Sequence, residues 1–124
     1  TEVLREAANR LPTDRESWDR LAMAETSFMR LLARLRSPEE EQAYRRALKA
    51  WEEVVRVDPR RSISYARRGM LLEEAGASGL DPEGLTRAEA DFAKAASLYP
   101  NSAIRQWQWG SLLQGLGRSE EGLA

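Results

Sequence analysis

The sequence contains neither cysteine nor histidine. Without cysteine the chain has no disulfide, no thiolate nucleophile and no sulfur ligand for a metal. Without histidine it also lacks the commonest metal-binding side chain and the one best suited to proton transfer near neutral pH. No glycine-rich phosphate loop, serine elbow or metal-binding motif takes their place. We therefore expect no catalytic residue, no metal and no cofactor in this segment.

An excess of charge of one sign is missing as well. The 124 residues include 19 basic and 20 acidic side chains, giving a net charge of -1. No overall field therefore draws the chain towards nucleic acid. The 17 arginines against 2 lysines we interpret as genome composition. We expect one domain that does not bind nucleic acid.

Long apolar runs are also absent. None approaches the roughly 18 residues that a membrane span requires. The first residues, TEVLREAANR, lack the basic and then apolar layout of a signal peptide. We therefore predict no direct membrane insertion by this segment.

Apolar residues recur instead at spacings of three and four, as on one face of a helix. One such run covers residues 18–35 and another covers 43–55. Ser37 followed by a proline, with Glu40 completing a capping box, marks one helix start, and Asp81 followed by a proline marks another. The predicted fold class is all-α.

Three prolines, Pro12, Pro59 and Pro100, each end a helical stretch, because proline has no amide hydrogen and crowds the preceding turn. By subtraction the intervals are 47 and 41 residues. Residues of the same type nevertheless recur at the same offsets from these prolines. An aromatic residue, Trp51 or Phe92, stands eight positions before the second and third prolines, with an alanine four positions earlier still.

Small residues recur in the helix that follows each proline, at Ala22, Gly69 and Gly110. Together these positions resemble the tetratricopeptide repeat, an antiparallel helix pair of about 34 residues with a Trp, Leu, Gly, Tyr pattern and then an Ala, Phe, Pro pattern. The resemblance implies helix pairs stacked as a right-handed α-solenoid. In it, the small residues let helices approach closely while the aromatic residue fills the gap between repeats. The sequence departs from the family pattern at Glu25, Arg68, Gln106 and Gly122.

The register of the resemblance divides the single domain into four successive parts. They are the second helix of a truncated repeat at 1–12, a repeat with lengthened helices at 13–59, a repeat with a loop insertion at 60–100, and a truncated repeat at 101–124. In the last part a first helix is expected to end at Gly117 and a second to begin at Ser119, a good N-cap. We interpret the incomplete ends as a cut through a longer array.

Both full repeats are longer than the family's about 34 residues, by about 13 and about 7 residues. We expect the first excess to lengthen both helices and the second to form a longer turn over 77–87. A leucine of that turn, Leu80 or Leu85, is predicted to pack against the lengthened helices. The contact would lie near Phe28, Leu32 or Tyr44. The alternative is a plain up-and-down helical bundle with irregular loops.

A cluster of arginines is the one suggestion of a charged site, and its members are Arg45, Arg46, Arg60, Arg61, Arg67 and Arg68. Arginine can bind phosphate or carboxylate with two parallel hydrogen bonds. Acidic residues lie close by in the sequence, however, and pairs at helical spacing such as Glu41 with Arg45 are expected. We interpret this region as a solvated face whose charges pair with one another.

In the repeat family, the first helix of each unit lines a concave groove that holds a peptide or a partner's helix. The resemblance therefore implies that the first helices of this chain bind a partner. Much of the expected lining is apolar, and methionine and tryptophan are adaptable and frequent anchors at interfaces. The lining residues are Asp19, Met23, Ile63, Ala66, Arg67, Met70, Ile104, Trp107, Gln108 and Ser111. One subgroup of the family grips a C-terminal carboxylate with lysine, asparagine and arginine at set groove positions. At those positions this sequence has Asp19, Met23, Ala66 or Arg67, and Ile104 with Gln108, so we do not expect that mode of binding. Alternatively, Met70 and Trp107 pack only against one another or against a neighbouring repeat.

We therefore predict a protein–protein interaction module that is not an enzyme and whose partner is a protein or peptide. The alternative is an accessory or self-association domain of a larger enzyme or membrane protein, with self-association through the truncated ends.

Overall fold

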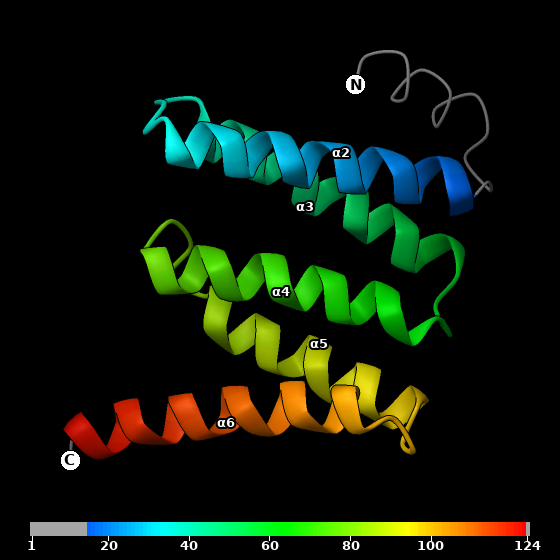
Figure 1. The fold of residues 1–124 in the computed structure, drawn as a ribbon, viewed down its shortest axis with the longest axis vertical. Coiled ribbons are helices and arrows are strands. Elements are labelled where there is room, and N and C mark those ends of the chain that lie inside the picture. The colour runs from blue at the N-terminus through cyan, green and yellow to red at the C-terminus, as the bar shows by residue number, and fades with distance from the viewer. Residues whose placement is uncertain (1–14, 124) are drawn as a thin grey trace. The chain divides into compact units, whose positions relative to one another are not determined.

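The computed structural model describes the backbone of residues 15–123 and the side chains of residues 15–116. This part of the chain is helical and contains no strand, so the all-α prediction is confirmed. The chain divides into two units, residues 1–60 and 61–124, which are described separately. The helix predicted over residues 1–12 lies outside the described residues. The helices are α2 (Arg15–Arg34), α3 (Glu40–Val57), α4 (Ser62–Ser78), α5 (Gly84–Leu98) and α6 (Ala103–Leu123) (Figure 1).

The two predicted helix starts share one arrangement. Ser37 Oγ accepts a hydrogen bond from the amide of Glu39 at 3.1 Å. Asp81 Oδ1 accepts one from the amide of Glu83 at 3.0 Å. In both cases a proline stands between donor and acceptor residues, and the helix begins directly after the glutamate. Helices therefore begin within three residues of both predicted starts. The serine and the aspartate hold the turn that precedes each helix, and the N-cap residues themselves, Glu39 and Glu83, form no side-chain cap hydrogen bond.

In the first unit, α2 and α3 pack against one another as a pair. They contain 20 and 18 residues, against 17 and 15 in the α4–α5 pair, so both are longer than their counterparts in the second unit. The predicted lengthening relative to the repeat family stays a prediction. Fully buried alanines, Ala22 on α2 and Ala47 on α3, allow the helices to approach closely.

Trp51 is the largest fully buried side chain of this unit, with 1% of its surface exposed. Its indole Nε1 donates a hydrogen bond to Thr26 Oγ1 at 2.9 Å. That hydroxyl in turn donates to the backbone oxygen of Ala22 at 2.7 Å. The buried indole nitrogen is therefore satisfied inside the core, as a buried polar group must be.

Glu25, at a position where the repeat family has an aromatic residue, is 1% exposed. Arg46 on α3 lies beside it, with Nε 3.3 Å from Glu25 Oε2. The same guanidinium lies 5.9 Å from the centroid of the Phe28 ring. An ion pair between the two helices therefore fills this position.

In the second unit the turn between α4 and α5 is shorter than the loop predicted over 77–87. Helix α4 continues to Ser78, and α5 begins at Gly84. Gly79 ends α4 with a φ of 83°, a left-handed conformation that glycine adopts without a steric penalty. The turn therefore covers residues 79–83, and the loop predicted over 77–87 is too long.

Two glycines make this tight turn possible by letting the backbones of α4 and α5 touch. A Cβ atom added to Gly84 would lie 2.7 Å from the amide nitrogen of Gly76 and closer still to the carbonyl oxygen of Leu72. One added to Gly76 would lie 2.6 Å from the amide nitrogen of Leu85. Helix α5 therefore begins in direct backbone contact with α4. The predicted packing of Leu85 or Leu80 on the first unit stays a prediction.

The small residues expected from the repeat pattern differ in their surroundings. A Cβ at Gly69 would lie 2.8 Å from Phe92 Cε1, so α4 and α5 approach closely at this glycine, as predicted. Gly110 is exposed, and a Cβ there would meet nothing within 4 Å. The predicted close packing at Gly110 is wrong, because α6 turns a different face, with Leu112, towards the core.

A bidentate ion pair, with two parallel hydrogen bonds, joins α4 to α5. Arg68 donates from Nε to Asp91 Oδ2 at 2.8 Å and from Nη2 to Asp91 Oδ1 at 2.7 Å. The side chains are 19% and 7% exposed. The Arg68 guanidinium also lies 5.7 Å from the centroid of the Tyr65 ring. This pair occupies the position where the repeat family has leucine.

Helix α6 packs on α5, and polar contacts hold its first turns in place. Ser102 Oγ accepts from the amide of Arg105 at 3.3 Å, which caps the helix. The Arg105 side chain donates from Nε to Ser62 Oγ on α4 at 3.2 Å. Further along α6, Trp109 Nε1 donates to Glu89 Oε1 on α5 at 2.9 Å.

Helix α6 runs without a break to Leu123. The predicted turn at Gly117 and the new helix at Ser119 are therefore wrong. Glycine costs a helix interior only about 1 kcal/mol relative to alanine, and serine is tolerated there, so such local signals do not by themselves end a helix.

Candidate functional site

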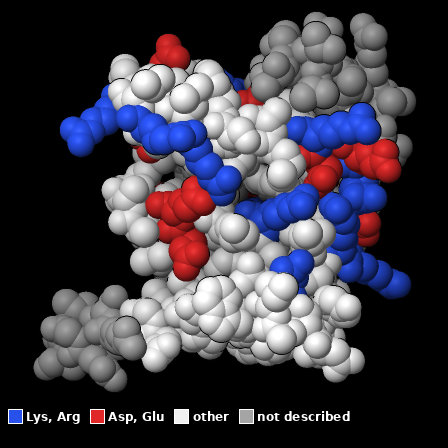
Figure 2. Space-filling model, viewed as in Figure 1, with Lys and Arg blue, Asp and Glu red and all other residues white. Residues whose placement is uncertain are grey.

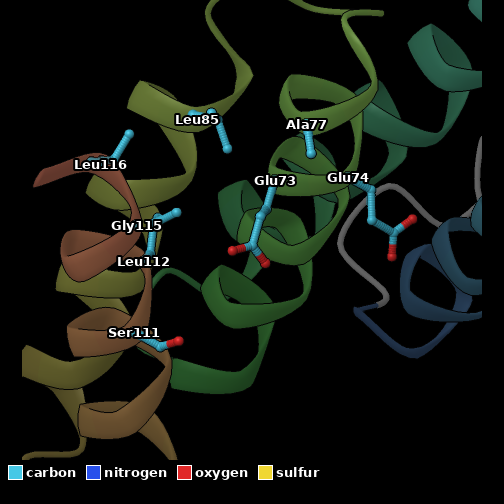
Figure 3. A pocket seen from close by; sticks show the side chains of 8 residues that line it. All are labelled: Glu73, Glu74, Ala77, Leu85, Ser111, Leu112, Gly115 and Leu116. Carbon is cyan, nitrogen blue, oxygen red and sulfur yellow. The ribbon is translucent and has the colours of Figure 1, made fainter. Parts of the chain in front are cut away.

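Two cavities that share lining residues lie between α4 and α6. The larger, of about 440 Å³, is lined by Glu73, Glu74, Ala77, Leu85, Ser111, Leu112, Gly115 and Leu116 (Figure 3). The smaller, of about 150 Å³, is lined by Met70, Glu73, Phe92, Trp107, Gln108 and Ser111. Because Glu73 and Ser111 line both, we treat the two cavities as one site, named the α4–α6 groove.

The helix packing explains why the groove is open. Helix α6 makes its principal contacts with α5 rather than with α4. The walls also carry small side chains, Ala77 on α4 and Ser111 and Gly115 on α6. A Cβ added to Gly115 would meet nothing within 4 Å. The space beside α4 is therefore filled by neither helix.

Apolar side chains form most of the lining of the larger cavity. Leu112 is 5% exposed, and Leu85 and Leu116 are half-buried. The polar residues of the lining are Glu73, Glu74 and Ser111. Neither cavity is lined by a lysine or an arginine of the described residues.

The two neighbouring glutamates point in different directions. Glu73 extends from α4 on the side that faces α6, whereas the Glu74 carboxylate points away from α6 (Figure 3). Partial burial raises the pKa of Glu73 above its ordinary value of 4.5, and the charge of Glu74 raises it further. Glu73 is thus the carboxylate of the groove, in surroundings that disfavour its charged form.

Four of the side chains predicted to bind a partner line the smaller cavity together, namely Met70, Trp107, Gln108 and Ser111. Gln108 Nε2 lies 3.9 Å from Met70 Sδ. Met70 is 40% exposed, and Trp107 is 71% exposed. The tryptophan ring is therefore mostly open to solvent.

The other residues predicted for the second unit lie outside the two cavities. Ala66 is 1% exposed, whereas Ile104 on α6 is 64% exposed. Ile63 and Arg67 are half-buried on α4. Asp19, half-buried, and Met23, 45% exposed, lie on α2 in the first unit.

Sequence reasoning missed Glu73, which lines both cavities. Met70, Glu73 and Ala77 follow one another at spacings of three and four, so they share a face of α4. That spacing could have placed Glu73 in the groove once Met70 was chosen. No comparable spacing in the sequence identifies Leu85 as a lining residue, because its position depends on how the start of α5 packs on α4.

The surface of α6 adds to the apolar character of the site. Side chains of Ile104, Trp107 and Leu113 are between 42% and 71% exposed. Figure 2 shows the surface over α6, at the bottom of the view, as nearly uncharged. The predicted pairing of charges, by contrast, is confirmed at Glu41 and Arg45 on α3, whose side chains lie 2.7 Å apart.

The fold and the groove define an all-helical protein with an apolar surface site that carries a carboxylate. Over the described residues no group of three or more acidic side chains is arranged to hold a metal ion. None of the described helices combines the length and the apolar character needed to cross a membrane. No protein-family model matches the chain, and a search of curated proteins finds no significant match.

Proposed function

We propose that this chain is a protein–protein interaction module whose α4–α6 groove binds a peptide or helix of a partner protein. The observation that carries the proposal is Trp107, which is 71% exposed at the edge of a cavity that it shares with Met70. Tryptophan is enriched among the residues that dominate binding energy, and methionine adapts its shape to a partner. Exposed apolar side chains gathered around a groove are typical of an interaction site.

The proposal includes a tetratricopeptide-like architecture, with helix pairs stacked as a right-handed α-solenoid. Two observations support it. The described helices form the pairs α2–α3 and α4–α5, and Trp51 and Phe92 are both buried at the same distance before a proline. In such an array α4 and α6 are the first helices of successive repeats, so their groove belongs to the concave binding surface of the family.

A second candidate is self-association, or an accessory role in a larger protein, and the apolar surface of α6 outside the groove favours it. Ile104 and Leu113 are 64% and 42% exposed and line neither cavity. Light scattering over a range of concentrations separates the two candidates. Self-association predicts a mass that rises with concentration, whereas a monomer at every concentration would exclude it.

A peptide selection tests the first candidate. The protein would be used to select binders from a phage-displayed library of 12-residue peptides, and selected peptides would be titrated as labelled synthetic chains by fluorescence anisotropy. We expect the double variant Trp107→Ala, Met70→Ala to bind at least about 30-fold more weakly, the loss typical of removing a dominant interface residue.

The matched control is Leu113→Ala, which removes an exposed apolar side chain of α6 outside the groove. We expect it to change the affinity by less than about 3-fold. Circular dichroism would verify that each variant is folded. Equal binding by the double variant and the unmodified protein would place the site elsewhere.

A further inference from the structure

We propose that the α4–α6 groove is specific for a partner segment in which a lysine or arginine stands between apolar residues, with Glu73 as the counter-ion. The inference rests on the proposed function, because it specifies the chemistry of the segment that the groove binds. It excludes acidic segments from the same site.

The lining of the larger cavity carries this inference first. Its volume of about 440 Å³ lies within the roughly 300–1,000 Å³ of typical ligand sites. Leu85, Leu112 and Leu116 offer apolar contact, while an ionised carboxylate can only accept hydrogen bonds. The complementary group is therefore a charged donor on an apolar stem. Lysine and arginine have this form, since their methylene stems pack on apolar surface while the head remains polar.

The charge around Glu73 supports the same conclusion. Among the described residues no basic side chain lines the groove, so the complementary charge must come from the partner. Glu73 lies in surroundings whose burial and whose neighbour Glu74 both disfavour a negative charge. A cation from the partner would reverse that penalty, whereas an acidic side chain would increase it.

The length of the groove places the basic residue between two apolar contacts. On α4 the lining extends from Met70 to Ala77, a separation of seven positions, or about 10 Å at the helical rise of about 1.5 Å per residue. On α6 it extends from Trp107 to Leu116, a separation of nine positions, or about 14 Å by the same rise. Glu73 lines both cavities and so lies between the tryptophan and the leucines. A segment of about two helical turns spans this distance.

The 12-residue peptides selected from the phage library provide the probe. We expect them to share a lysine or arginine flanked by apolar residues. Replacing that basic residue by norleucine, which keeps an apolar side chain and removes the charge, is expected to weaken binding about 10-fold. Glu73→Gln is expected to weaken binding of the unmodified peptide to a similar extent. The norleucine peptide is expected to bind Glu73→Gln and the unmodified protein within about 3-fold of one another.

Glu39→Gln is the matched control, because it removes the same charge from an exposed glutamate of the first unit. It is expected to leave the affinity unchanged within about 2-fold. Selected peptides without a common basic residue, or equal binding by Glu73→Gln, would overturn the inference while leaving the proposed function intact. Failure to select any peptide, or binding that is insensitive to Trp107→Ala, Met70→Ala, would overturn the proposed function itself.

Discussion

The contact between the backbones of α4 and α5 predicts that Gly84→Ala destabilises the protein. A Cβ at this position would lie 2.7 Å from the Gly76 amide nitrogen, and both close neighbours are backbone atoms that cannot rotate away. The helices would have to separate by several tenths of an ångström. Such overpacking typically costs about 1–3 kcal/mol. We expect a loss near the upper end of that range, about 2–3 kcal/mol, because no flexible side chain is available to yield.

The same substitution at Gly110 is the matched control, and we expect the opposite sign. Gly110 lies within α6, is exposed, and would place its Cβ in open space. Alanine there restricts the unfolded chain and favours the helix, a gain of about 0.5–1 kcal/mol.

Urea denaturation followed by circular dichroism at the helical band measures both variants. The account predicts that the midpoint falls for Gly84→Ala and rises for Gly110→Ala. A Gly84→Ala protein as stable as the unmodified one would show that the backbones of α4 and α5 do not touch as described.

Three further predictions concern buried polar groups. Asp91→Asn is expected to lower the free energy of unfolding, measured by urea denaturation, by about 2 kcal/mol. Removing one partner of a fully buried ion pair costs more, about 3–5 kcal/mol. The smaller loss is expected here because 19% of the Arg68 side chain is exposed. Thr26→Val removes the acceptor of the Trp51 indole and is expected to cost about 1–2 kcal/mol, with an unchanged helical spectrum as the check on folding. The raised pKa of Glu73 means that the folded protein binds this proton more tightly than the unfolded chain, so its contribution to stability falls as the pH rises above 4.5. Glu73→Gln is therefore expected to have a higher melting temperature than the unmodified protein at pH 7, with the difference closing as the pH falls to 4.5, and a constant difference would contradict the assignment.

The helix starts could be predicted from the sequence because they depend on local chemistry. A serine or aspartate followed by proline needs only its own neighbours to form the turn that leads into a helix, and helices begin after both such turns, at Glu40 and Gly84. Periodicity was similarly sufficient to predict an all-helical chain, since it reflects the face that each helix must bury.

The glycines show why the remaining structure could not be predicted in the same way. The same residue type has three different surroundings in this structure. Gly69 faces an aromatic ring, Gly84 faces the backbone of another helix, and Gly110 faces solvent. Their roles depend on the packing of another helix, which local sequence does not encode. The same limit applies to the groove, where Met70 and Trp107 could be chosen by residue type but the wall formed by Leu85 could not.

Mapping a selected peptide by nuclear magnetic resonance tests the central claim most directly. A selected 12-residue peptide would be titrated into uniformly ¹⁵N-labelled protein while the backbone amide signals are followed. The account predicts that the largest shifts fall in residues 70–77 and 107–116, together with the indole signal of Trp107. Saturable binding that leaves both stretches and that indole unperturbed would contradict the α4–α6 groove as the binding site.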